Sequence, residues 1–174
     1  LFKGFFENLF KKAVVAAYLL LVTGLILWLS ERLIQARLQS SSTKKQEKTL
    51  KELSLIDSLI VGFAQALAIA PGISRSGTTI AAGLWRSFSR EEAARYSFLL
   101  AIPIILGAAV EEGRNLSFAS GSKIVLIFGF LAAVLSGHYS IKYLLKYLRQ
   151  GKLNIFAYYC WIVGIGFIMW KIGA

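Results

Sequence analysis

Four apolar runs dominate the chain, and each approaches the roughly 20 residues that an α-helix needs to cross the hydrocarbon core of a membrane. The runs lie at residues 13–30, 96–110, 124–141 and 155–170. Ser89 and Glu92, ahead of the second run, have the spacing of a capping box that begins a helix. The pattern predicts an all-α fold, a polytopic membrane helical bundle that forms one domain.

Composition agrees with a membrane protein and narrows the partners. Hydrophobic residues make up 56% of the 174-residue chain, and the mean hydropathy is +0.62, above the roughly 45–50% apolar content of ordinary soluble domains. The net charge of +11 is explained by basic loops held at an anionic lipid surface. We therefore expect a membrane as partner and no nucleic acid. The single cysteine, Cys160, allows no internal disulfide.

Two shorter apolar segments, residues 55–70 and 78–85, flank the sequence PGISRSG at residues 71–77. At roughly 1.5 Å per residue, the second segment is much shorter than the roughly 30 Å hydrocarbon core. Two geometries remain open. One is a single crossing broken by a polar loop, and the other is a re-entrant helix–loop–helix over residues 55–88 that enters and leaves on one side. A polar linker at residues 31–54 precedes this region.

The distribution of basic residues favours the re-entrant geometry. In that geometry the segments 31–54, 86–95 and 142–152 share one side of the membrane and hold thirteen basic residues, against six on the other side. Cytoplasmic loops carry an excess of Lys and Arg. The rule therefore places these three segments in the cytoplasm and both termini outside.

The 71–77 motif has the composition of an oxyanion site. Non-helical backbone and a buried arginine at membrane depth are tolerated only where protein, water or an anionic partner satisfies them. Gly72 and Gly77 permit close backbone approach, and Thr78 or Thr79 would cap the following helix so that its free amides point at the loop. The remaining donors are the side chains of Ser74, Arg75 and Ser76.

The ligand expected at such a cluster of donors is a phosphate or another oxyanion. The competing interpretation is an ordinary cytoplasmic loop with a Pro-Gly turn and a solvated arginine. Neither the P-loop signature nor the Gly-x-Ser-x-Gly signature of hydrolases fits these residues. The motif by itself therefore leaves both interpretations open.

Two longer stretches carry a resemblance. GFAQALAIAPGISRSGTTIAAGL and SREEAARYSFLLAIPIILGA, within residues 62–107, closely resemble the second-half signature of the undecaprenyl pyrophosphate phosphatase family, the bacterial bacitracin-resistance membrane enzymes. The resemblance implies hydrolysis of undecaprenyl pyrophosphate to undecaprenyl phosphate, which recycles the lipid carrier for peptidoglycan and cell-wall synthesis. It also implies half of an inverted-repeat fold, a bacterial cytoplasmic membrane, and an active site that faces outward.

Carried over by position, the resemblance assigns catalytic roles to three residues of the motif. Arg75 would clamp the pyrophosphate and stabilise the transition state, with Ser74 and Ser76 as phosphate hydrogen-bond donors. A second hypothesis makes Ser74 or Ser76 the nucleophile. Substrate-binding positions would be Gly72, Gly77, Thr78, Thr79 and Gln65. A glutamine satisfied by helix contacts is an equally good interpretation of Gln65. A divalent cation, Mg²⁺ or Ca²⁺, is also implied.

The sequence departs from the family in its acidic groups. The family's Glu-x-x-x-Glu and Pro-x-Ser-Ser-x-Gly-His motifs have no match here, so the sequence offers no metal ligands, and Asp57, Glu91, Glu92, Glu111 and Glu112 are expected in solvated or capping roles. We expect a chain that lacks the first repeat, pairs with a missing N-terminal half or a second copy, and catalyses little alone. Two alternatives remain: a transporter or flippase of an anionic lipid, and a degenerate half-protein that only regulates a partner.

Overall fold

The computed structural model describes residues 13–40, 47–115 and 122–173, and these residues form helices and their connections. The elements in chain order are α2 (Ala13–Ser40), the short 3-10 helix η1 (Leu50–Glu52), α3 (Leu55–Leu67), α4 (Arg75–Trp85), α5 (Arg90–Asn115), α6 (Ser122–Gln150) and α7 (Asn154–Gly173). The β-structure among the described residues is a single isolated β-bridge between Lys48 and Phe88. The predicted all-α class is confirmed.

Four of these helices, α2, α5, α6 and α7, are long and apolar enough to cross a membrane, as expected of a polytopic membrane protein. All four run beyond the apolar runs of the sequence. The clearest difference is in α2, which continues to Ser40 through the first residues of the expected linker. The helix continues because Glu31 and Ile34, one turn apart, are both buried against neighbouring elements rather than solvated.

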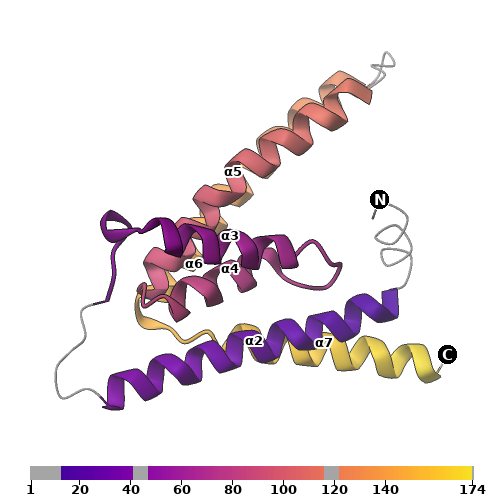
Figure 1. Ribbon diagram of the computed structural model, residues 1–174. Helices are drawn as coiled ribbons and strands as arrows, with labels where there is room; N and C mark the ends of the chain where they lie inside the picture. The colour runs from indigo at the N-terminus through magenta and orange to yellow at the C-terminus, as the bar shows by residue number, and fades with distance from the viewer. Residues whose placement is uncertain (1–12, 41–46, 116–121, 174) are drawn as a thin grey trace.

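The helices form two antiparallel pairs and a hairpin. Helices α2 and α7 lie side by side, and α5 and α6 run together away from them (Figure 1). Gly24 allows the close approach of α2 and α7, because a Cβ there would lie 2.5 Å from the ring nitrogen of Trp161. That nitrogen donates a hydrogen bond to the carbonyl of Leu21. The hairpin of α3 and α4 packs through α4 against both α2 and α5.

One end of the molecule gathers the termini of six helices; we call it the basic end. Arg37 near the end of α2 donates to the carbonyls of Leu84 and Trp85 at the end of α4. Asp57 at the start of α3 pairs with Arg86 just after α4. Helix α3 therefore begins, and α4 ends, at the same end of the molecule, which is the geometry that a re-entrant pair requires.

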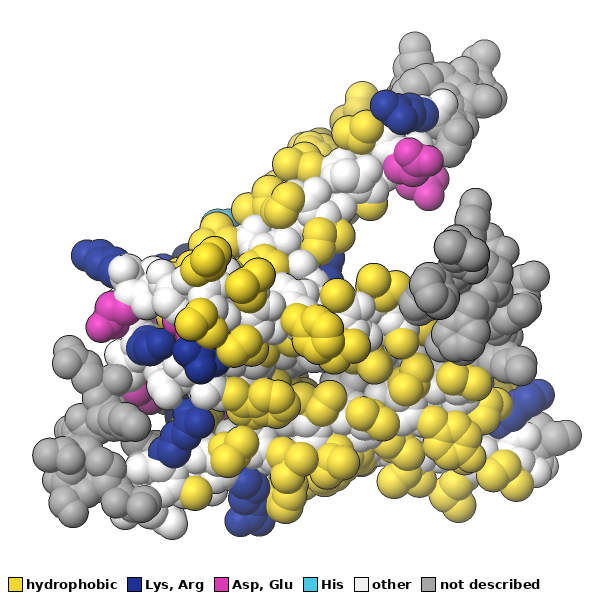
Figure 2. All heavy atoms as spheres, in the orientation of Figure 1, with side chains coloured by type: hydrophobic (Ala, Val, Ile, Leu, Met, Phe, Trp, Pro, Cys, Tyr) yellow, Lys and Arg dark blue, Asp and Glu magenta, His cyan; other side chains and the backbone are white. Residues whose placement is uncertain are grey.

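The ends of α5, α6 and α7 join the basic end through two further contacts. Arg149 near the end of α6 pairs with Glu91 in the first turn of α5, and the N–H of Leu153, just before α7, donates to Glu31. Figure 2 shows Lys and Arg side chains gathered at this end, on the left, while hydrophobic side chains cover most of the rest of the visible face. The buried core lies beneath the basic end and includes Leu27, Ile34, Leu84, Phe88 and Leu148.

Candidate oxyanion site at the start of α4

The loop between α3 and α4 is shaped by Gly72. Its φ is +95°, in the left-handed region that glycine adopts without strain. A Cβ at this position would lie 2.1 Å from the carbonyl oxygen of Ala16 on α2. Both the conformation and the space therefore require glycine, and the loop is pressed directly against the backbone of α2.

Ser74 is the N-cap of α4. Its hydroxyl oxygen accepts a hydrogen bond of 3.1 Å from the N–H of Gly77, and its carbonyl accepts one of 2.9 Å from the N–H of Thr78. The prediction that Thr78 or Thr79 caps the helix is wrong, because the chain already becomes helical at Arg75. Serine is a favoured N-cap residue, because its side-chain oxygen accepts a hydrogen bond from a backbone N–H of the first helical turn. The motif itself supplies this serine.

The early start of α4 places the motif on the first turn of a helix. In the described part of the chain, no group accepts from the N–H groups of Arg75 and Ser76. The hydroxyls of Ser74 and Ser76 lie 3.4 Å apart. Two backbone donors and two hydroxyls therefore surround the positive end of the α4 dipole, where anions bind in many proteins.

Arg75 adds a permanent positive charge at the same place. Its side chain is half-buried, and among residues 13–40, 47–115 and 122–173 it has no ion pair. Arg86, Arg90 and Arg149, in contrast, each pair with a carboxylate. A cation in the first helical turn is disfavoured by the helix dipole. An anionic ligand would relieve the repulsion between them.

The threonines among the predicted site residues form hydrogen bonds within the first turns of α4 or to α5. The Thr78 hydroxyl donates to the carbonyl of Ser74 at 2.8 Å. Thr79 is buried, and its hydroxyl lies 2.6 Å from that of Ser97 on α5 while donating to the carbonyl of Arg75. Gly77 leaves room beside the Ser74 side chain, 3.1 Å from where its Cβ would be. In this structure Thr78 and Thr79 hold α4 in place.

Gln65 lies in the last turns of α3, ahead of the loop. Its amide oxygen Oε1 is buried and accepts no hydrogen bond from the described residues. A buried acceptor without a donor is costly, so a donor such as water or a ligand hydroxyl would be stabilised there.

Acidic groups lie elsewhere. Asp57 forms a capping box with Ser54, as the capping role predicted for it requires, but it is also fully buried. Burial alone would raise the pKa of Asp57, but hydrogen bonds from Arg86, Ser54 and Lys48 outweigh that effect and hold the pKa well below its usual range. Glu91 is bound to Arg95 and Arg149.

These contacts bear on the divalent cation implied by the family resemblance. Across the described residues, no three His, Cys, Asp or Glu side chains lie close enough to hold a metal ion. His138 packs edge-on against Tyr139 on α6, with ring centroids 5.6 Å apart. The described residues therefore do not fit a metal site, and the 71–77 motif contains no carboxylate, imidazole or thiol that could bind a metal ion.

Three functional candidates were missed in the sequence. Thr23 on α2 bonds to the hairpin loop, Ser97 on α5 bonds to Thr79, and Glu31 pairs with Arg90. Glu31 had a detectable signal, since it lies on the helical stripe that joins Leu27 to Ile34. The polar residues at positions 23 and 97 could be noticed inside apolar runs, but their partners are distant in the sequence.

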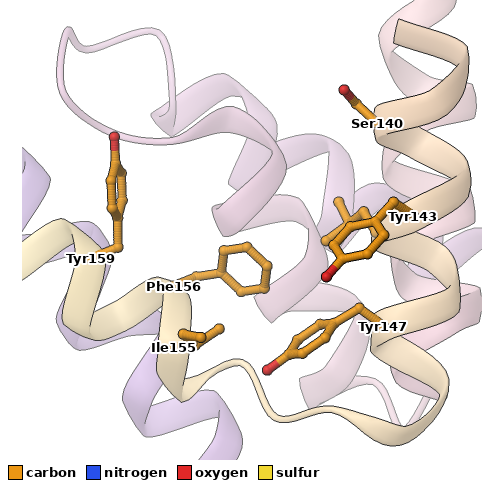
Figure 3. A pocket seen from close by; sticks show the side chains of 7 residues that line it. Ser140, Tyr143, Tyr147, Ile155, Phe156 and Tyr159 are labelled. Atoms are coloured by element: carbon orange, nitrogen blue, oxygen red, sulfur yellow. The ribbon is translucent and has the colours of Figure 1, made fainter. Parts of the chain in front are cut away.

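A cavity of about 570 Å³ lies between α6 and α7, neither of which contains the 71–77 motif (Figure 3). It is lined by Ser140, Tyr143, Leu144, Tyr147, Ile155, Phe156 and Tyr159. The rings of Tyr147 and Phe156 meet edge-on, 5.9 Å apart. The cavity shares no residue with the candidate site, and its lining lacks charged groups suited to a phosphate.

Comparison with known proteins places the chain in a family. A family model described as bacitracin resistance protein BacA matches residues 1–166. An undecaprenyl-diphosphatase of Methanothermobacter thermautotrophicus is 50% identical over 171 residues, which cover 95% of this chain and 88% of that protein. Undecaprenyl-diphosphatases of Halothermothrix orenii and Carboxydothermus hydrogenoformans are 48% and 47% identical, over 97% and 94% of this chain. The chain spans only 62% and 61% of the length of these two relatives.

Proposed function

Because the chain belongs to the bacitracin resistance protein BacA family, we propose that its 71–77 motif holds the pyrophosphate group of undecaprenyl pyrophosphate during hydrolysis to undecaprenyl phosphate and inorganic phosphate. The proposal rests on one observation above all. Arg75, half-buried and without a carboxylate partner among the described residues, lies in the first turn of α4 beside the two free N–H groups. Every group at this place donates hydrogen bonds, as a pyrophosphate requires.

The reaction breaks the bond between the terminal phosphorus and the bridging oxygen, and a water oxygen forms the new bond to phosphorus. Negative charge develops on the bridging oxygen as it leaves. The planar guanidinium of Arg75 can donate two parallel hydrogen bonds to phosphate oxygens, and the amides of Arg75 and Ser76 add the helix dipole. Donors arranged before the reaction stabilise this charge without reorganisation.

Ser74 and Ser76 serve in this proposal as hydrogen-bond donors. An activated serine nucleophile needs an adjacent general base, and no carboxylate or imidazole bonds to either hydroxyl within the described residues. No step of the proposed mechanism passes through a divalent cation, because the described residues do not form a site for one.

The proposed location is a cytoplasmic membrane with the basic end in the cytoplasm. The excess of Lys and Arg in the segments that meet at this end supports that orientation, and so does the shared end of α3 and α4. In this orientation the motif lies at the turn of a hairpin that enters the membrane from the cytoplasmic side without crossing it. Substrate would reach the motif from the outer side.

Phosphate release from undecaprenyl pyrophosphate tests the function, with the full gene product in lipid nanodiscs. We expect Arg75→Gln to lower kcat/KM by about 10²-fold to 10³-fold, the usual loss for one such donor, and Arg75→Lys to restore only part of it, because an ammonium lacks the planar fork. Near-normal release by Arg75→Gln would refute the clamp. Translocation of the lipid by wild type without any release would refute hydrolysis and favour an anionic-lipid flippase.

A further inference from the structure

Thr23 is a polar side chain in the middle of the apolar helix α2, and only 1% of it is exposed. Its single O–H hydrogen is shared between two carbonyl acceptors, that of Gly72 at 3.1 Å and that of Leu19, one turn earlier on α2, at 3.2 Å. The same oxygen accepts a hydrogen bond of 3.1 Å from the N–H of Ser74. One hydroxyl therefore bridges two backbone groups of the hairpin loop on either side of Ile73.

A second contact between the loop and α2 lies at Gly72. Ala16, two turns before Thr23 on α2, contacts Gly72 so closely that no side chain fits there. The methyl carbon of Thr23 would also lie 3.5 Å from a Cβ on Gly77. The loop thus has steric contact with α2 at Ala16, while Thr23 supplies its hydrogen bonds to α2.

The position of Ser74 decides the position of the proposed site. Ser74 caps α4 through its side chain and precedes Arg75, so its backbone fixes where the first turn of α4 begins. A shift of its N–H would move the guanidinium and the free amides together. Misplacement of catalytic groups by about 1 Å costs roughly 10²-fold in rate.

We propose that Thr23 is a positioning residue for the pyrophosphate site: its hydroxyl fixes Gly72 and Ser74 on α2, and thereby sets the direction in which Arg75 and the first turn of α4 present their donors. The inference rests on the proposed function of the motif. Thr23 itself touches no substrate in this scheme, since its hydroxyl is buried and its hydrogen bonds are used within the protein.

Two substitutions separate the hydroxyl from the shape of the side chain. Thr23→Val keeps the volume but leaves the Ser74 N–H without its acceptor, whereas Thr23→Ser keeps the hydroxyl. Ser30→Ala is the matched control, because Ser30 is equally buried on α2, two turns away, and among the described residues its hydroxyl bonds only to the carbonyl of Ile26 within that helix. If Thr23→Val does not fold, Thr23→Ala makes the same comparison.

Amide hydrogen exchange over residues 70–78 is measured first, in nanodiscs, alongside phosphate release from undecaprenyl pyrophosphate. We expect Thr23→Val to speed exchange in this segment and to lower kcat by about 10-fold to 10²-fold. Thr23→Ser should restore both, and Ser30→Ala should change neither. The kcat effect should exceed any effect on KM, because the donors remain present but are misdirected.

The outcomes distinguish this inference from the proposed function. Unchanged loop exchange in Thr23→Val would refute the role of Thr23, whatever the activity. Faster loop exchange with unchanged kcat would also refute it, because the loop position would then not matter for the reaction. A wild type that neither binds nor hydrolyses the lipid would refute the proposed function, even if exchange showed that Thr23 anchors the loop.

Discussion

Glu31 and Arg90 form a buried, two-pronged ion pair between α2 and α5. The guanidinium Nη2 lies 2.6 Å from one carboxylate oxygen and Nε lies 3.1 Å from the other, and the Glu31 side chain is fully buried. The same carboxylate accepts from the N–H of Leu153 and from the Gln35 side chain. A single charged group thus connects α2, α5 and the start of α7 at the basic end.

Glu31→Gln should destabilise the protein strongly. Removal of one partner of a buried pair leaves an uncompensated charge, which typically costs about 3–5 kcal/mol. We expect a marked fall in Tm for this variant in detergent. The control is Glu91→Gln, which breaks the pairs with Arg149 and Arg95, whose side chains are 60% and 46% exposed. Exposed pairs contribute about 0–1 kcal/mol, so equal Tm losses in the two variants would contradict the structural role of Glu31.

The sequence signals for the expected helix–loop–helix are local. Pro71 and Gly72 end one apolar segment, the motif begins the next helix, and the basic residues around Arg86 indicate the end to which the chain returns. These cues depend on composition, spacing and backbone preference, which a single sequence displays. The observed α3 and α4 lie within residues 55–88.

The sequence could not reveal which polar residues meet across helices. Glu31 looks like the start of a solvated linker until Arg90, far along the chain, is placed beside it. In the sequence, Thr23 is an isolated hydroxyl inside an apolar span, and only the structure shows that the N–H of Ser74 in the loop donates to it. Such contacts depend on the packing of α2 against α4 and α5, and periodicity within one segment contains no information about that packing.

Asp57 should make the stability of the protein depend on pH in the acidic range. Its pKa is lowered in the folded protein, so its contribution is fully present above the unfolded value of about 3.9. The contribution is lost as the pH falls below about 4 toward the folded pKa. Wild type should therefore lose Tm more steeply than Asp57→Asn between about pH 5 and pH 3, although the variant starts lower. Parallel slopes would contradict the pairing with Arg86 and Lys48.

Gly72→Ala should damage the site far more than its small size suggests. The new methyl group would overlap the Ala16 carbonyl, 2.1 Å away, at a φ of +95°. Strain from an unfavourable φ alone costs about 1–2 kcal/mol, and the overlap would push the loop away from α2. We expect a lower Tm and greatly reduced phosphate release. Gly62→Ala on α3 is the control, since its Cβ meets nothing within 4 Å; a similar loss there would contradict the specific role of Gly72.

Cysteine labelling tests whether the hairpin is re-entrant. Cys160 is buried and is first replaced by alanine. Single cysteines then replace Lys51 before α3, Arg95 after α4 and Lys152 before α7, all at the basic end, and Glu112 and Lys171 near the far ends of α5 and α7. In intact cells, a membrane-impermeant maleimide should label the last two and spare the first three until the cells are permeabilised. Labelling of only one of Lys51→Cys and Arg95→Cys would mean that residues 55–88 cross the membrane once, and the proposed access of substrate to the motif from the outer side would then be wrong.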